Sequence, residues 1–409
     1  MQESSPAPTL IERTGVAYFP LALVARLPFA MMVVGVLTLI VSARGSLQLG
    51  GISSAVVGIG SAIVGPFLGA AADRYGQRIA LLIAAVTHSA ALVTLAFIAY
   101  SAAPDWAMLL VAFFVGATSP QTSPMSRSRL VLIIQNFLPP TRRPKVMSQV
   151  LAYESAADEV VFVFGPVIVG LLATFFGPRT PILAAAALTI LFIISFALHH
   201  TSAPAKTAAE RAETLAPASE LARPSLLVVV AGIAGVGLVF GTTLTALTAF
   251  MQNLGRPEAA GLFYGIMGIG SAILAISVAF FSPKFTLRYR WLVFAVFVVA
   301  GEAILATSTS MGGIAAGLAL TGIGIGPLLV TLYSLGTARS PEGRSATVMT
   351  MLGSGVILGQ SLSSAIGGTV AENVGVQAAM ALPFYAGAFA LLAGVINWML
   401  TPSGSGRDV

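Results

Sequence analysis

The sequence predicts an all-α membrane protein with twelve transmembrane helices, arranged as two pseudo-symmetric bundles of six. Three observations lead to this prediction: an apolar composition, twelve long apolar segments, and a repeat that relates the two halves. Of the 409 residues, 56% are hydrophobic and only 9% are charged. Because a soluble domain carries about 25% charged residues, most of this chain cannot face water.

Twelve segments are apolar enough to cross a bilayer, whose core of about 30 Å needs about 20 helical residues. They lie near 17–41, 49–72, 79–100, 106–126, 147–173, 180–198, 225–250, 259–281, 291–310, 312–336, 345–370 and 378–400. The polar, Ala- and Pro-rich segment 201–223 is typical of a solvated linker. It divides the chain into an N-terminal bundle (1–200) and a C-terminal bundle (224–409). The stretch 127–146 is predicted as a further loop, with Leu130–Ile134 at the membrane interface.

The basic residues predict the orientation. Of the 21 Lys and Arg residues, seventeen fall at the termini or in even-numbered gaps between segments, and three fall in odd-numbered gaps. Loops rich in Lys and Arg stay on the inner side of a membrane. We therefore expect a multi-pass protein of the plasma membrane with both termini and the linker in the cytoplasm. The same bias accounts for the net charge of +6 without a nucleic-acid partner. No cleavable signal peptide is predicted, and the first segment is expected to direct insertion.

Several kinds of chemistry need residues that this sequence lacks. There is no cysteine, and there are only three histidines, so neither a metal centre nor a cofactor is predicted. A phosphate-binding G-x-x-x-x-G-K-[ST] loop is missing, so ATP is not the energy source in this chain. A G-x-S-x-G nucleophile is missing as well. The sequence does not predict an enzyme.

An internal repeat relates the two predicted bundles. The string Gly-Ile-Gly-Ser-Ala-Ile occurs at 58–63 in the second segment and again at 268–273 in the eighth. Each copy is followed at the same spacing by a basic loop, at 73–78 and at 283–288. Two similar bundles are what alternating access requires, because they can rock about a site on their shared axis.

The loop after the second segment carries a motif. Gly69, Asp73, Arg74, Gly76 and Arg78 fit the pattern G-x-x-x-D-R-x-G-x-R. This resembles the signature between helices two and three of the major facilitator superfamily, and the resemblance extends over essentially the whole chain. It implies a secondary transporter of a small-molecule substrate that works as a monomer.

The parts of this motif have separate physical roles. Gly69 permits a close helix approach, and Gly76 supplies the freedom of a tight turn. By the resemblance, Asp73 accepts hydrogen bonds at the start of the eleventh helix, near 345–347, and latches the cytoplasmic side shut. Arg74 and Arg78 would pair with acidic groups or lipid phosphates. The alternative is that these charges only anchor a cytoplasmic turn.

A second element concerns the direction of transport. Gly165, Pro166 and Gly170 in the fifth segment are similar to an element of the family's proton-coupled exporters, although Val161 and Val169 stand where glycine is expected. This similarity favours proton-coupled efflux. A packing kink in the helix is the alternative for the element itself. Proton-coupled import of a nutrient, and a sensor or scaffold with the same fold, are the alternatives for the function.

Charged residues inside the predicted membrane segments are the principal site candidates. They are Arg26 in the first segment and Glu154, Asp158 and Glu159 in the fifth. A charge at the bilayer centre costs about 2.5–3.5 kcal/mol, so such residues almost always face the interior of a bundle. At about 1.5 Å per residue, Arg26 and Asp158 both lie about 13–17 Å from the cytoplasmic ends of their helices. We expect Arg26 to pair with Asp158 or Glu154, which lie one helical turn apart.

This charge cluster has two possible roles. In the first, one carboxylate exchanges a proton while Arg26 keeps another ionised, so that protonation weakens the pair and couples proton movement to the movement of the bundles. Since arginine does not deprotonate, the carboxylates would carry the proton. In the second, a permanent ion-pair network braces the helices.

Polar residues in the fourth and eleventh segments are candidates for substrate contact. Two prolines predict a broken helix at 120–124, whose freed backbone groups are tolerated only against protein or water. The Gly- and Pro-containing stretch 322–327 predicts a matching interruption in the tenth segment. Gln121 and Thr122 are expected to contact substrate, and Gln360 to line the cavity. The alternatives are a hinge without substrate contact and an interhelical hydrogen bond.

Two further polar residues lie at similar depths in the two halves. His88 is in the third segment and Glu302 is in the ninth. Both segments are peripheral in the family that the chain resembles, so local polar packing is expected for both. Phe29, Met32 and Tyr333 are candidates for an apolar cavity wall or for the core.

Overall fold

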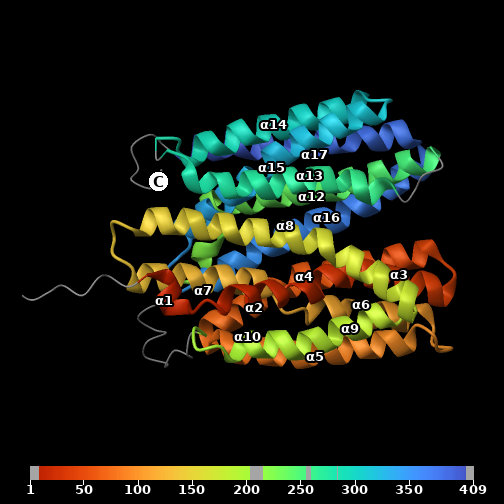
Figure 1. Cartoon of the computed structure of the whole chain (residues 1–409), viewed down its shortest axis with the longest axis horizontal. Coiled ribbons are helices and arrows are strands. Elements are labelled where there is room, and N and C mark those ends of the chain that lie inside the picture. The colour runs from red at the N-terminus through yellow and green to blue at the C-terminus, as the bar shows by residue number, and fades with distance from the viewer. Residues whose placement is uncertain (1–8, 203–214, 255–258, 283, 402–409) are drawn as a thin grey trace, which may run out of the picture.

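The computed structural model describes residues 9–202, 215–254, 259–282 and 284–401. Within these ranges every regular element is a helix. Eleven helical segments are long and apolar enough to cross a membrane, and a broken pair of shorter helices supplies the remaining one of the twelve predicted crossings. Figure 1 shows the helices running along the long axis of the molecule in two groups, one from each half of the chain.

The N-terminal half contains the first six crossings. A short helix, α1 (Leu10–Thr14), precedes them and is capped by the Thr9 side chain. The crossings are α2 (Tyr18–Val24) with α3 (Leu27–Arg44), α4 (Leu47–Tyr75), α5 (Gln77–Ile98), α6 (Asp105–Ala117) with α7 (Thr122–Phe137), α8 (Arg143–Phe176), and α9 (Thr180–Leu188) continued by the π-helical turn η1 (Thr189–Ile193) and α10 (Ile194–Leu198).

The C-terminal half contains the other six. Of the predicted linker, residues 203–214 lie outside the described residues, and its end forms the 3₁₀ turn η2 (Ala218–Ala222). The crossings are α12 (Pro224–Asn253), α13 (Ala259–Ser277) with the turn η3 (Val278–Phe280), α14 (Leu287–Thr307), α15 (Met311–Arg339), α16 (Ser345–Asn373) and α17 (Val376–Leu400).

The packing of the helices repeats from one half to the other. In the N-terminal half α3 packs on α8 and α9, and α5 packs on α6 and α9; in the C-terminal half α12 packs on α16 and α17, and α14 packs on α15 and α17. The repeated glycines take equivalent places: Gly60 of α4 lies against the α6 backbone, and Gly270 of α13 lies against the α15 backbone. The two halves meet through two equivalent pairs, α4 with α16 and α8 with α13.

The fourth crossing is broken where two prolines predicted it, but it continues further than expected. α6 ends at Ala117, and α7 starts at Thr122 and runs to Phe137. The prediction of a loop at 127–146 was therefore wrong for its first half, because Leu130 and Ile134 are buried in the core of the N-terminal half rather than placed at an interface. The matching interruption predicted in the tenth segment is wrong as well, since α15 runs unbroken through Pro327.

Small residues bring the two halves together along α4 and α16. A Cβ atom on Gly58, Gly65 or Gly69 of α4 would overlap the hydroxyl of Ser361, Ser354 or Thr350 of α16, respectively. Without a hydrophobic driving force between helices in lipid, such small residues permit the close packing that holds membrane helices together. The contact at Gly69 is the close approach that the motif predicts.

Candidate functional site

A cavity lies between the two halves of the molecule. Its empty volume is about 760 Å³, including the part that is open to solvent. The N-terminal half lines it from α3, from the break between α6 and α7, and from α7 and α8; the C-terminal half lines it from α12, α15 and α16. The lining residues are Arg26, Phe29, Ala30, Pro120, Gln121, Thr122, Ser123, Pro124, Arg127, Ser155, Asp158, Val161, Phe162, Phe240, Leu329, Tyr333, Gly353, Val356 and Ile357.

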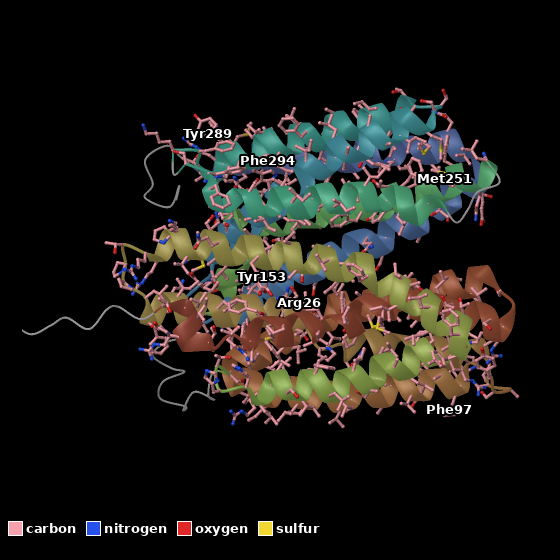
Figure 2. The ribbon with its side chains drawn as sticks, viewed as in Figure 1. Arg26, Phe97, Tyr153, Met251, Tyr289 and Phe294 are labelled. Atoms are coloured by element: carbon pink, nitrogen blue, oxygen red, sulfur yellow. The ribbon has the colours of Figure 1, made fainter. Side chains whose placement is uncertain are left out.

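Arg26 lies at the break between α2 and α3, in the interior of the molecule (Figure 2). Its side chain is only 3% exposed and forms two ion pairs with α8. One Nη donates to Glu154 Oε2 at 2.5 Å, and the other lies 3.2 Å from Asp158 Oδ1. The second oxygen of Glu154 accepts from Ser126 Oγ at 3.1 Å, and Tyr18 Oη lies 2.9 Å from that hydroxyl.

A second arginine, Arg127 of α7, completes this cluster. Its Nη2 donates to Asp158 Oδ2 at 2.7 Å, and the same oxygen accepts from Ser123 Oγ at 2.7 Å. The guanidinium also lies over the ring of Tyr333, with Cζ 3.8 Å from the ring centroid. Because Tyr333 belongs to α15, this cation–π contact connects the charge cluster of the N-terminal half to the C-terminal half.

The four charged members balance one another. Two guanidinium groups face two carboxylates, which reduces the cost of removing each charge from water. Glu154 is fully buried, whereas Asp158 is 20% exposed and lines the cavity. Asp158 is therefore the member that a proton from the cavity can reach.

Sequence reasoning missed Arg127. It was assigned to a basic loop, but it is 1% exposed within a helix. Arg129, two residues further on, is also buried, and it donates to Gln77 Oε1 at 3.1 Å and to the Phe196 carbonyl at 3.0 Å. The available signal was the absence of glycine and of further proline between Pro124 and the Pro139–Pro140 pair, which permits one continuous helix. Without these two arginines, the basic bias still predicts the same orientation.

The predicted substrate contacts lie in different places. Gln121 and Thr122 line the cavity, and Gln121 Nε2 donates to Ser61 Oγ at 3.0 Å. Gln360 lies on α16 and is half-buried, but it is not among the residues that line the cavity. The side chain of Glu159 lies outside the described part of the structure, so of the three acidic candidates only Glu154 and Asp158 can be placed.

The apolar candidates also separate into two groups. Phe29 and Tyr333 line the cavity. Met32 is buried in the core of the N-terminal half.

Asp73 lies at the N-terminus of α16, on the other half of the molecule. Its carboxylate accepts from the backbone N–H of Ala346 at 3.0 Å, from that of Thr347 at 2.7 Å, and from the Thr347 hydroxyl at 2.6 Å. Unpaired N–H groups and the positive end of the helix dipole both favour an anion at this position. These bonds join the two halves at the end of α4.

The other members of the loop motif surround Asp73. Gly76 has a φ of 90°, a conformation that side-chain-bearing residues rarely adopt, so glycine is required for the turn from α4 to α5. Arg74 and Arg78 are both exposed, and the Arg74 guanidinium lies over the Tyr75 ring at 5.2 Å.

Of the two glycines in the glycine–proline element of α8, one contributes to packing. A Cβ on Gly165 would lie 2.7 Å from the Ala30 Cβ and 2.9 Å from its backbone carbonyl carbon, so this glycine permits the close approach of α3. A Cβ on Gly170 would meet nothing within 4 Å. The Pro166 side chain lies outside the described part of the structure, and α8 is continuous through this position.

The remaining buried candidates lie away from the cavity. Glu302 of α14 is fully buried, and its Oε1 accepts from Thr243 Oγ1 at 3.0 Å. His88 of α5 has Nδ1 2.9 Å from the Val115 carbonyl oxygen. Among the described residues there is no group of three or more His, Cys, Asp or Glu that could hold a metal ion.

The chain resembles known proteins in sequence family and in fold. A family model described as the Major Facilitator Superfamily matches residues 18–352. A comparison of the sequence with characterised proteins finds no match. The fold is similar to the crystal structure of the human organic anion transporter MFSD10 (TETRAN), with a TM-score of 0.67 and 17% identity, covering 95% of this chain and 100% of that one.

It is also similar to a bacterial homologue of the iron transporter ferroportin in its outward-facing state, with a TM-score of 0.66 and 16% identity, covering 93% of this chain and 98% of that one. A second structure of that homologue, with soaked iron, gives a TM-score of 0.65 and 15% identity over the same shares. At these identities the likeness concerns the fold, whereas the family model spans most of the sequence. The chain is a membrane transporter by family, and it belongs to the major facilitator superfamily.

Proposed function

We propose that the chain is a proton-coupled secondary transporter that moves a small solute across the plasma membrane by alternating access. It works as a monomer in the lipid bilayer, with both termini in the cytoplasm. Two structural neighbours are titled for different cargoes, organic anions and iron, so the fold does not select one. The largely apolar wall of the cavity supports a small organic solute.

The proposed proton coupling rests on the position of Asp158. It pairs with Arg26 on one side and with Arg127 on the other, and Arg127 stacks on Tyr333 of the opposite half. Protonation of Asp158 would remove the charge that holds both guanidinium groups. Because such pairs are strong only while both members are charged, a proton at Asp158 would alter the contact between the halves.

The bonds of Asp73 support a latch at the cytoplasmic end. They join α4 to the start of α16, and these two elements must separate if the cytoplasmic side is to open. We propose that the latch is closed in the outward-facing state and opens when the halves rock. A movement of this kind needs two packings that differ by only a few kcal/mol.

The direction of transport has two candidates. Export by proton antiport is the direction that the glycine–proline element favours. The contact of Gly165 with Ala30 gives one part of this element a packing role, so the element supports export less strongly than the sequence alone would indicate. Import together with a proton is the second candidate. In antiport the proton and the solute compete for the site, whereas in cotransport they bind together.

The test is transport into proteoliposomes with an imposed pH gradient, using a panel of small organic solutes. The parent is compared with Asp158→Asn and with Glu302→Gln, which removes a buried carboxyl away from the cavity. We expect gradient-driven flux in the parent and in Glu302→Gln, and its loss in Asp158→Asn. The sign of the gradient that drives uptake gives the direction. Equal flux and equal pH dependence in Asp158→Asn would reject proton coupling at this residue in favour of a permanent brace.

A further inference from the structure

We infer that the cavity binds an amphipathic organic anion, whose acid group pairs with Arg127 and Arg26 when Asp158 carries a proton. This inference rests on the proposed proton exchange at Asp158, and it adds the chemical class of the substrate.

The buried polar atoms that lack a described partner on the residues lining the cavity are donors or hydroxyls. The Nε atoms of Arg26 and Arg127 are buried and donate to no described residue. The hydroxyls of Thr122 and Ser155, which also line the cavity, have no partner among the described residues. Both oxygens of Asp158, by contrast, are engaged by guanidinium or hydroxyl groups. Since a buried donor without an acceptor is costly, a ligand that brings acceptor oxygens fits this site best.

The ion pairs argue against an organic cation. A cationic ligand would have to take Asp158 from two guanidinium groups that already contact it at 3.2 and 2.7 Å. Removing one partner of a buried ion pair leaves an uncompensated charge, which is strongly unfavourable. An anion does the opposite, because it supplies a partner for charges that would otherwise lose one.

The net charge of the cluster connects the anion to the proton. With Arg26, Arg127, Glu154 and Asp158 all ionised, the cluster is neutral. One proton on Asp158 leaves a single positive charge, and one bound monoanion restores neutrality. Because the other three charged members of the cluster are buried, net charge in the cluster is unfavourable, and the proton and the anion stabilise each other's binding. They therefore move in the same direction, as in the second candidate for the direction of transport.

The remaining wall of the cavity defines the rest of the ligand. Phe29, Phe162, Phe240, Leu329 and Ile357 line it with aromatic and aliphatic groups from both halves. The rings of Phe29 and Phe162 are in edge contact, with centroids 6.1 Å apart. A carboxylate attached to an aromatic or aliphatic body would contact both the charged cluster and the apolar wall, whereas an inorganic anion would not contact the apolar wall.

The test is equilibrium binding to the purified full chain, with three aryl scaffolds of different size. The scaffolds are benzene, naphthalene and anthracene. Each is tested with three head groups: a carboxylate, the matching primary amide and the matching methylammonium ion. We expect at least one carboxylate to bind about tenfold or more tightly than its amide and its ammonium partner. Its affinity should rise as the pH is lowered, since the proton and the anion bind together.

Variants separate the parts of this inference. Asp158→Asn mimics the protonated acid, so it should bind the carboxylate as tightly at neutral pH as the parent does at low pH, with little remaining pH dependence. Arg127→Gln should lose the preference for carboxylates. Arg129→Gln, which removes a buried arginine of the same helix away from the cavity, should keep it. If Arg127→Gln does not fold, the pH dependence of carboxylate binding to Asp158→Asn tests the inference on its own.

Three results would overturn the inference: a preference for the ammonium series, equal binding of all head groups, or no binding of any member. None of these measurements needs a gradient or a sealed vesicle. Flux without a preference for anions would therefore reject the inference and keep the proposed transporter. Tight anion binding without gradient-driven flux would reject the proposed coupling and keep the anion site.

Discussion

Two fully buried glutamates, one in each half of the molecule, have different surroundings. Glu154 of α8 receives a guanidinium from Arg26 at 2.5 Å and a hydroxyl from Ser126 at 3.1 Å. Glu302 of α14 receives a hydroxyl from Thr243 at 3.0 Å and also faces the Thr321 hydroxyl. Both are equally remote from water, so burial alone does not distinguish them.

The difference lies in the chemistry of the partner. A carboxylate beside a guanidinium can remain ionised in the interior, and its charge then holds other groups in place. A buried carboxyl that is offered only hydroxyls is most stable as the neutral acid. We therefore expect the pair in the N-terminal half to change its interactions when a proton arrives, and Glu302 to act as a polar packing residue.

The largest effect should follow from removing a buried cation. Arg26→Gln leaves Glu154 without its guanidinium, and we expect the free energy of unfolding in detergent to fall by about 3–5 kcal/mol. Arg44→Gln is the matched control at the other end of α3. Arg44 forms a 3.9 Å ion pair with the exposed Asp105 and donates to the Ala103 carbonyl at 2.8 Å. We expect the loss of both contacts to cost about 1–2 kcal/mol. Equal losses of unfolding free energy in the two variants would mean that the buried ion pair stabilises the protein no more than the exposed one.

The two glutamates themselves allow a direct comparison. Glu154→Gln removes a charge that Arg26 needs, and we expect a loss of about 2–5 kcal/mol. Glu302→Gln keeps an oxygen that accepts from Thr243, so we expect a loss within about 1 kcal/mol. Thermal unfolding of both variants in the same detergent measures the difference. The interpretation of Glu302 as a neutral acid would be wrong if its substitution were the more damaging one.

Asp73 extends the comparison to a carboxylate held by backbone amides. Asp73→Asn keeps the shape of the side chain but removes its charge from the α16 N-terminus. We expect the closed cytoplasmic end to lose about 1–2 kcal/mol relative to the open one. Because the chain contains no cysteine, spin labels can be attached without background labelling at Thr141→Cys, between α7 and α8, and at Glu342→Cys, between α15 and α16. They report the distance between the cytoplasmic ends of the two halves. An unchanged distance distribution would argue against a latch.

The sequence predicts the helices well, for a physical reason. A long, continuously apolar segment crosses a membrane as a helix, because each segment must satisfy the hydrogen bonds of its own backbone groups. The loop motif correctly indicated which residues approach α16, because Gly69 and Asp73 act through their backbone geometry and charge. Depth counted along two helices was enough to bring Arg26 and Asp158 together.

The failures concern residues whose environment is made by distant parts of the chain. α7 is polar in composition, so Arg127 looked like a loop residue, and its contacts with Ser123, Asp158 and Tyr333 explain its burial. Gln360 is polar and lies on α16, a helix that lines the cavity. Its side chain lies on a side of α16 that is not part of the cavity lining. Pro327 was expected to break its helix, yet α15 is continuous there.

The most direct test of the coupling is the conformational equilibrium of the substrate-free protein as a function of pH. The same pair of spin labels, in lipid nanodiscs, reports the distance between the cytoplasmic ends in the parent, in Asp158→Asn and in Glu302→Gln. The proposed coupling predicts a distance distribution that changes with pH in the parent and in Glu302→Gln, and one that does not change in Asp158→Asn. A pH response in Asp158→Asn equal to that of the parent would contradict it.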